Sequence, residues 1–154
     1  MSEPQLVLIA GPNGSGKSTV TARLAEFGIS LPANYINADD IARSLADTHP
    51  DTPQVERERI AFRQARELRR TYREQKQSFA FETVFSHPST LLDMLQCRAA
   101  GFEVRLLFVS TENAEINVLR GFEADAVTGD LGFPDPRPVG LGKVFLVFQT
   151  YDVD

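Results

Sequence analysis

The sequence predicts an α/β fold in which a mostly parallel sheet is covered by helices on both faces. Short apolar runs alternate along the chain with amphipathic segments of helical period. This alternation is typical of parallel strands joined by right-handed helical crossovers. A glycine-rich loop also joins the first apolar run to the first amphipathic segment. We therefore expect a three-layer sandwich with one sheet between two layers of helices.

The glycine-rich loop carries the phosphate-binding pattern G-x-x-x-x-G-K-[ST], known as the P-loop or Walker A motif. The apolar run 6–10 leads into it, and residues 17–27 after it have the pattern of a helix. Every fixed position of the motif is present in Gly11-Pro12-Asn13-Gly14-Ser15-Gly16-Lys17-Ser18. A strand, this loop and a helix in succession form the context that makes the pattern a phosphate site. The chain is therefore predicted to bind a nucleoside triphosphate with Mg²⁺.

Each residue type in the motif has a chemical reason. Gly14 and Gly16 allow the backbone to approach a ligand closely, and the loop amides point partial positive charge at an anion. Lys17 adds a full positive charge at the phosphates, and the Ser18 hydroxyl can ligate Mg²⁺. The predicted nucleotide-binding residues are Gly11, Asn13, Gly14, Ser15, Gly16, Lys17, Ser18 and Thr19.

The elements after the loop follow from local signals. Gly28 is placed to end the helix 17–27, and residues 35–37 form a short strand. The helix that starts near residue 38 has two candidate N-caps, Asp39 and Asp40, because aspartate accepts hydrogen bonds from free amides of the first turn.

The next predicted helix covers residues 54–76. Its apolar face at helical spacing consists of Ala61, Ala65, Leu68 and Tyr72. Seven arginines cover the rest, interleaved with glutamates: Arg57, Arg59, Arg63, Arg66, Arg69, Arg70 and Arg73. Mixed charges around a helix indicate a solvated surface helix and not a nucleic-acid-binding stripe. Arg63 or Arg66 can still face the site of a molecule that accepts a phosphoryl group from the nucleotide.

The second half of the predicted core repeats the alternation. Residues 78–83 form a strand, Pro88 suits the first turn of a helix that ends at Gly101, and residues 103–109 form another strand. Thr111 is the expected cap of a further helix. From residue 121 the chain is rich in Gly, Pro and Asp without a sustained period, and residues 144–148 form a terminal strand.

Composition sets outer bounds. The 154 residues fit one domain, with the regular alternation of elements over 1–120, the part that the resemblance described below marks as kinase-like, and an atypical segment over 121–154. A formal charge of -5 argues against a protein that coats nucleic acid. No apolar run reaches the length of a membrane span and no signal peptide is visible, so a cytoplasmic enzyme without membrane or nucleic-acid partners is expected. Cys97 is the single cysteine and is expected to pack within a helix.

Four charged residues beyond the loop are candidates for chemistry. Ligands of such sheets collect beyond the carboxyl ends of the strands, where Asp39, Asp40 and Glu82 are expected. Asp40 is interpreted as a helix-end acid, whereas Asp39 fits either a cap or a catalytic base. Glu82 fits a polar strand end, or a ligand for an acceptor hydroxyl or a metal-bound water. Arg120 fits either the dipole of its helix or the transferring phosphoryl group.

These residues together resemble the zeta-toxin family of P-loop kinases. The resemblance covers about residues 5–120 and is carried by residues 8–19, 35–42, 81–86 and 100–104. It implies ATP-dependent phosphorylation of a UDP-amino sugar, such as UDP-N-acetylglucosamine, and a small antitoxin that blocks the ATP site. It also implies residue roles. Asp39 matches the general base, Lys17 the phosphate-binding lysine, Ser18 the magnesium ligand and Arg120 the first arginine of the lid. The substrate-binding residues implied are Asp39, Glu82 and Thr83.

The resemblance stops after Arg120. Zeta-like kinases continue into a lid with further arginines, whereas Arg137 is the one arginine that follows here. Three interpretations stay open: a zeta-like small-molecule kinase, a nucleotide-binding remnant without the arginine lid, and a P-loop kinase with another acceptor. That other acceptor is a small metabolite, an antibiotic or a polynucleotide end, of which the acidic net charge disfavours the polynucleotide. We also hypothesise that the C-terminal segment is degenerate through a frame shift or truncation.

Overall fold

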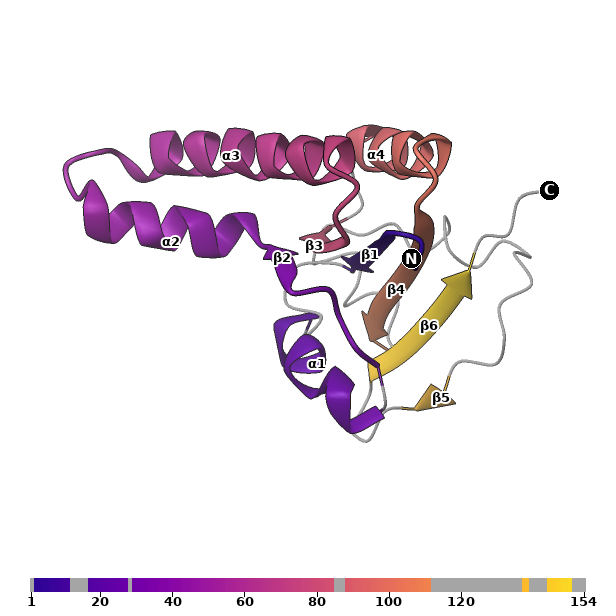
Figure 1. Cartoon of the computed structure of the whole chain (residues 1–154). Helices are drawn as coiled ribbons and strands as arrows, with labels where there is room; N and C mark the ends of the chain where they lie inside the picture. Colours follow the sequence, from indigo (N-terminus) through magenta and orange to yellow (C-terminus); the bar gives the residue numbers. More distant parts are fainter. Residues whose placement is uncertain are drawn as a thin grey trace.

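The computed structural model describes residues 2–11, 17–27, 29–84, 88–111, 137–138 and 144–150. The described helices, including one 3₁₀ turn, are α1 (Lys17–Arg23), η1 (Leu24–Phe27), α2 (Ala38–Thr48), α3 (Gln54–Glu74) and α4 (Pro88–Ala99). The described strands are β1 (Gln5–Ala10), β2 (Asn34–Ile36), β3 (Phe79–Thr83), β4 (Glu103–Thr111), β5 (Arg137–Pro138) and β6 (Val144–Thr150). Elements alternate along the chain as predicted (Figure 1).

The described strands form one sheet in the order β2-β3-β1-β4-β6-β5. The first four in this order are parallel, and in their register Leu8 of β1 lies between Phe81 of β3 and Leu106 of β4. β6 is antiparallel to β4, and β5 is antiparallel to β6. The predicted α/β fold with a mostly parallel sheet is therefore confirmed, with antiparallel strands at one edge.

Both faces of β1 are buried, which explains why all of its residues from Leu6 to Ala10 are apolar. Leu6 and Leu8 belong to one core cluster, with Ala65 of α3 and Met94 of α4. Alternate residues Val7 and Ile9 belong to a second cluster, with Val20 of α1 and Leu24 of η1. Side chains of a strand alternate between its faces, so the two clusters are the two faces of the sheet. The predicted layers of helices on both faces are confirmed.

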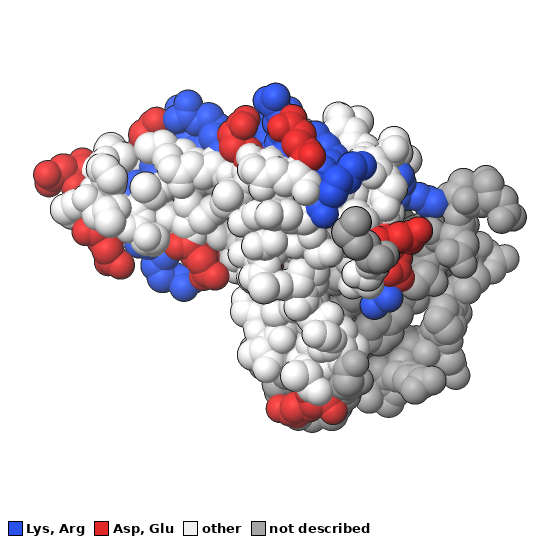
Figure 2. All heavy atoms as spheres, in the orientation of Figure 1, with Lys and Arg blue, Asp and Glu red and all other residues white. Residues whose placement is uncertain are grey.

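α2 and α3 lie side by side and extend beyond the edge of the sheet that β2 forms (Figure 1). Basic and acidic side chains are mixed over this part of the surface (Figure 2), as expected for a solvated helix. Arg59 and Arg63 pair with Glu56, and Arg70 pairs with Glu74, all at exposed positions.

The C-terminal end of α3 departs from the predicted solvated helix. Arg69 Nε lies 3.0 Å from Asp93 Oδ2, and Arg73 lies 3.6 Å from Asp93 Oδ1. These side chains are only 11%, 19% and 16% exposed for Arg69, Arg73 and Asp93. The Arg69 guanidinium also lies over the Phe81 ring. Two inward arginines therefore join α3 to α4, which a pattern of mixed charge cannot indicate.

Other expectations need local corrections. Within 17–27 the α-helix ends at Arg23 and continues as the tighter η1 turn, and β2 lies one residue earlier than predicted. Leu68 was placed on the buried face of α3 but is 38% exposed, whereas Ala61 and Ala65 are buried. Thr111 is the last residue of β4, which is longer than expected. The helix that Thr111 was expected to cap lies outside the described residues. The segment 121–142 contains the short strand β5, and the terminal strand runs to Thr150.

The single cysteine behaves as predicted. Cys97 is fully buried in α4, and burial raises the pKa of its thiol to about 11. A thiol that holds its proton so firmly is a poor nucleophile, so Cys97 contributes packing. Gly101 ends α4 with φ of 85°, a conformation that favours glycine, as expected from the sequence. In the part of the chain that the structure describes, no helix combines the length and hydropathy of a membrane span.

Candidate functional site

Three segments meet at the carboxyl edge of the parallel strands. Gly11 follows β1, Asn37 follows β2, and Glu82 and Thr83 are the last residues of β3. Because β1, β2 and β3 are adjacent and parallel, their ends lie at the same edge of the sheet. Ligand sites of open α/β sheets lie at this edge.

Lys17 places a cation at this edge. It is the first residue of α1, and its Nζ donates a hydrogen bond to the carbonyl oxygen of Gly11 at 2.7 Å. Burial lowers the pKa of Lys17 below its ordinary value, while the negative charges of Glu82 and Asp39 act in the opposite direction. The lysine therefore lies within electrostatic reach of both predicted acidic site residues.

Thr83, the last residue of β3, contacts both the residue after β1 and a residue of α4. Its carbonyl oxygen accepts a hydrogen bond from the amide of Gly11 at 3.2 Å, which fixes the start of the loop against β3. Its hydroxyl lies 3.3 Å from the hydroxyl of the buried Thr90. Thr83 thus holds the base of the site together, and its predicted contact with a substrate stays a prediction.

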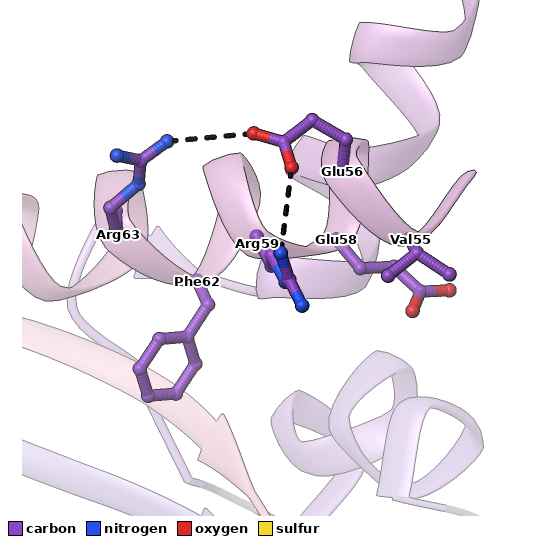
Figure 3. A pocket seen from close by; sticks show the side chains of 6 residues that line it. All are labelled: Val55, Glu56, Glu58, Arg59, Phe62 and Arg63. Carbon is purple, nitrogen blue, oxygen red and sulfur yellow. Dashed lines mark ion pairs between the residues drawn. The ribbon is translucent and has the colours of Figure 1, made fainter. Parts of the chain in front are cut away.

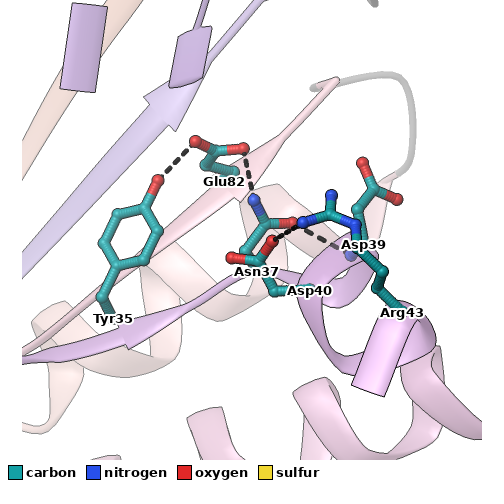
Figure 4. A network of polar contacts seen from close by, with 6 residues as sticks. All are labelled: Tyr35, Asn37, Asp39, Asp40, Arg43 and Glu82. Carbon is teal, nitrogen blue, oxygen red and sulfur yellow. Dashed lines mark hydrogen bonds and ion pairs between the residues drawn. The ribbon is translucent and has the colours of Figure 1, made fainter. Parts of the chain in front are cut away.

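Glu82 is held by donors from the neighbouring segment (Figure 4). The Tyr35 hydroxyl donates a short hydrogen bond to Oε1, and the Asn37 side-chain amide donates to Oε2 at 2.9 Å. Both carboxylate oxygens therefore have a neutral donor. The carboxylate lies between the tyrosine and the asparagine, so its orientation is determined by β2 and the residue that follows it.

Tyr35 is itself a perturbed group. Burial raises the pKa of its hydroxyl above the ordinary value of 10.0, and the hydrogen bond to Glu82 adds to the rise. A hydrogen bond with Thr21 of α1 acts in the opposite direction. The Tyr35 hydroxyl is therefore a neutral hydrogen-bond donor throughout the physiological pH range.

Asp39 and Asp40 lie next to each other in the first turn of α2 but differ in their contacts. Asp40 forms an exposed ion pair with Arg43, at 3.0 Å. The exposed Asp39 receives no hydrogen bond at its carboxylate from any described residue. In Figure 4 it points away from Tyr35 and Glu82. The interpretation of Asp40 as a helix-end acid agrees with its pairing, and Asp39 remains accessible.

The N-cap of α2 is Asn37 and not one of the aspartates, so that expectation was wrong. Asn37 has extended backbone angles, and its side-chain oxygen accepts the amide hydrogen of Asp39 at 2.9 Å. Asparagine is as good an N-cap as aspartate, so position 37 was available as a signal. Its second contact, with Glu82, joins residues 45 apart in the chain and had no local signal.

The other predicted site residues are placed as follows. Ser18 follows Lys17 in the first turn of α1 and is exposed, so its hydroxyl is accessible to a ligand. The backbone of Thr19 lies in α1. The loop positions Asn13, Gly14, Ser15 and Gly16 and the predicted lid residue Arg120 lie outside the described residues.

The described flanks of the loop suit a phosphate group accompanied by a divalent cation. Lys17 supplies positive charge, and the Ser18 hydroxyl is the type of ligand that Mg²⁺ accepts. Among the described residues no cluster of three or more His, Cys, Asp or Glu side chains could hold a metal by itself. This is consistent with Mg²⁺, which is commonly bound through few protein ligands together with substrate phosphates.

A separate hollow of about 600 Å³ lies on α3 (Figure 3). Its lining residues are Val55, Glu56, Glu58, Arg59, Phe62 and Arg63. None of the predicted site residues contributes to it. The Glu56 ion pairs bring Arg63 and Arg59 to the rim, so Arg63 is directed to this surface.

The fold and the sheet-edge site define a P-loop kinase-like nucleotide-binding domain. The family model AAA_33, described as an AAA domain, matches residues 6–118. This match spans more than half of the 154-residue chain. The chain belongs to this family.

Two solved structures share the fold. One is described as a "putative kinase" from Chloroflexus aurantiacus, with a TM-score of 0.57 and 20% identity over 82% of this chain and 69% of that chain. The other belongs to the PezAT chromosomal toxin-antitoxin system of Streptococcus pneumoniae. Its TM-score is 0.57, with 18% identity over 79% of this chain. The match covers 52% of that chain, about half of its length.

A shorter match reaches higher identity. A cytidylate kinase of Natronomonas pharaonis is 52% identical over 48 residues. These residues make up 31% of this chain and 23% of that enzyme, so the match spans less than a quarter of the enzyme's length.

Proposed function

We propose that this protein is an ATP-dependent phosphotransferase that transfers the γ-phosphoryl group to an alcohol of a small molecule. The observation that supports this proposal is the position of Lys17 within electrostatic reach of Glu82 and Asp39 at one edge of the sheet. A phosphate-binding cation next to carboxylates is the combination that a kinase needs, because it binds a polyphosphate and also orients a hydroxyl.

We assign a role to each predicted site residue. Lys17 and Ser18, with the loop between Gly11 and Lys17, bind the phosphates and the accompanying Mg²⁺, which neutralises charge on them. Asp39 takes the proton of the acceptor hydroxyl while the hydroxyl oxygen forms a bond to the γ-phosphorus. At the same time the bond between the γ-phosphorus and the β,γ-bridging oxygen breaks. Glu82, held by two neutral donors, orients the acceptor through hydrogen bonds. Arg120 is assigned to the transferring group on the basis of the sequence alone.

The acceptor proposed first is a UDP-amino sugar such as UDP-N-acetylglucosamine. The sequence resemblance to zeta toxins supports it, and the fold shared with a chain of the PezAT system agrees with it. An antitoxin partner and a cytoplasmic location belong to the same proposal. A nucleoside monophosphate such as CMP is the second candidate, because the matched segment of a cytidylate kinase is 52% identical. Its accepting group is a phosphate oxygen and not an alcohol, so it is an alternative reaction type.

The test is ATP turnover with UDP-N-acetylglucosamine, with CMP and without an acceptor. We expect UDP-N-acetylglucosamine to stimulate turnover and Asp39→Asn to reduce that stimulated rate by about 10²–10⁴-fold, the usual contribution of a general base. Stimulation by CMP instead would indicate transfer to a phosphate oxygen, which has no hydroxyl proton for Asp39 to take. Asp40→Asn is the matched control in the same helical turn, and we expect its rate to stay within about threefold.

Two results would change the proposal. ATP binding without turnover in the presence of either acceptor would support the nucleotide-binding remnant, or a different acceptor found by a wider screen. Equal losses in Asp39→Asn and Asp40→Asn would indicate a general effect of charge at the start of α2, and would remove Asp39 from the role of base.

A further inference from the structure

The side chain of Asn37 uses both ends of its amide. Its oxygen accepts the backbone amide hydrogen of Asp39, and its nitrogen donates to Glu82, each at 2.9 Å. Of the residues that cap helices well, aspartate has the same size and the same acceptor but no N–H to donate. Capping α2 therefore does not require asparagine, whereas the contact with Glu82 requires its N–H donor.

Tyr35 completes the set of contacts from the other side. In the parallel register Tyr35 lies opposite Ala80, and Glu82 follows two residues later on the same face of β3. The Tyr35 ring packs against the core cluster that contains Ala80, so its hydroxyl is directed along the strand towards Glu82. Both donors to Glu82 thus come from β2 and the residue that continues it.

We propose that Tyr35 and Asn37 are positioning residues that hold both oxygens of Glu82 and fix this carboxylate relative to the first turn of α2, where Asp39 lies. The inference rests on the proposed phosphotransferase function and deepens it. The two carboxylates at this site then have different roles. Glu82 has one orientation and accepts hydrogen bonds, whereas Asp39 receives no hydrogen bond from the described residues and is available for a proton.

The charged and titratable groups around Glu82 are Lys17 of α1, Tyr35 of β2, and Asp39 and Asp40 of α2. Lys17 of α1 interacts electrostatically with Glu82 and Asp39, and Tyr35 of β2 interacts with Glu82 and Asp40. The Asn37→Asp variant adds a carboxylate directly opposite Glu82. Two facing carboxylates retain a shared proton to higher pH than either one alone.

The test compares Asn37→Asp with Asn34→Asp. Asn34 is also on β2 and also donates its side-chain amide across the sheet, to the carbonyl oxygen of Ser78, the residue before β3. This contact lies at the opposite end of β2. With the acceptor that stimulates turnover, we expect Asn37→Asp to lower kcat by about 10–100-fold, with the Kd for Mg·ATP within about twofold. The loss is smaller at low pH, where the shared proton supplies an O–H donor between the two carboxylates, and larger at high pH, where the two ionised carboxylates repel each other.

Tyr35→Phe removes the second donor without removing the ring. We expect kcat to fall by about 3–10-fold. The pH dependence of kcat should not change, because this substitution adds no charge. Tyr72→Phe is the control for loss of a tyrosine hydroxyl elsewhere. If Asn37→Asp has the kcat and the pH profile of Asn34→Asp while the wild-type protein is active, the inference is wrong.

A second measurement does not depend on turnover. Asn37→Asp and Asn34→Asp are each made in the wild-type and the Glu82→Ala backgrounds, and urea midpoints are measured. We expect Asn37→Asp to lower the midpoint strongly in the wild-type background and much less without Glu82, whereas Asn34→Asp lowers it equally in both. Equal effects of Asn37→Asp in both backgrounds would overturn the inference. If wild-type turnover is absent while the coupling is present, the phosphotransferase proposal fails and the positional inference stands.

Discussion

The Lys17 ammonium and the Gly11 carbonyl oxygen lie 2.7 Å apart, so the two ends of the phosphate-binding motif are joined by a hydrogen bond. The Gly11 amide in turn donates to the carbonyl oxygen of Thr83 at the end of β3. The position of the cation therefore depends on β1, β3 and α1 together. This position of Lys17 leads to the first three of five predictions, and the other two concern Tyr35 and the contact between α3 and α4.

Replacing Lys17 by methionine should weaken nucleotide binding. The charge-assisted hydrogen bond to phosphate contributes about 1.5–3 kcal/mol, so we expect the Kd for Mg·ATP to rise about 10–100-fold by calorimetry. Lys76→Met is a suitable control, because Lys76 also donates to a backbone carbonyl, that of Ala100, but is exposed and far along the chain. An unchanged Kd in Lys17→Met would exclude this lysine from the nucleotide site.

The affinity for nucleotide should also depend on alkaline pH. Burial lowers the pKa of Lys17 below the ordinary value of 10.5, so the ammonium loses its proton before an exposed lysine would. We expect the Kd for Mg·ATP to rise as the pH increases through this lowered value. In Lys17→Arg the guanidinium keeps its charge, so a Kd that rises equally in this variant would contradict the assignment.

The same shift has a consequence for stability, with a definite sign. Between the lowered pKa of Lys17 and 10.5, the unfolded chain binds more protons at this lysine than the folded chain. The contribution of Lys17 to the free energy of unfolding therefore rises with pH in this window. Urea unfolding of the nucleotide-free protein, compared with Lys17→Met, measures it.

Tyr35 should act in the opposite direction at higher pH. Burial and the hydrogen bond to Glu82 raise the pKa of Tyr35 above 10.0, so the folded chain keeps a proton that the unfolded chain loses. The stabilising contribution is fully present below pH 10 and is lost as the pH rises above it. Absorbance at 295 nm should show a late tyrosine ionisation in the wild type that is lost in Tyr35→Phe and kept in Tyr72→Phe.

The ion pairs of Asp93 with Arg69 and Arg73, which join α3 to α4, should contribute to the free energy of unfolding. Asp93→Asn leaves Arg69 and Arg73 with their charges partly buried and unpaired, so we expect the free energy of unfolding to fall by about 2–4 kcal/mol. Glu74→Gln breaks the exposed pair with Arg70 on the same helix and should change the free energy of unfolding far less, because solvent screens this pair. Urea denaturation of both variants measures the difference. Equal losses would show that the burial of the Asp93 pairs is energetically unimportant.

Much of the fold could be predicted from the sequence because the signals are local. The continuous apolar run of β1 indicated a strand buried on both faces, and Gly101 indicated the end of α4. Errors arose where two local solutions have similar energy. Asn37, Asp39 and Asp40 are all good helix caps, and the choice among them depends on the Asn37 contact with Glu82.

The sequence by itself determined the phosphate-binding motif, since its residues are contiguous and their chemistry does not depend on distant partners. It also determined the alternation of strands and helices. Only the tertiary structure decided which side chains meet at the sheet edge. Tyr35 and Glu82 are 47 residues apart, and Arg69 and Asp93 are 24 apart. The parallel register of β2 with β3 and the packing of α3 on α4 bring these pairs together, and neither is encoded in a local pattern.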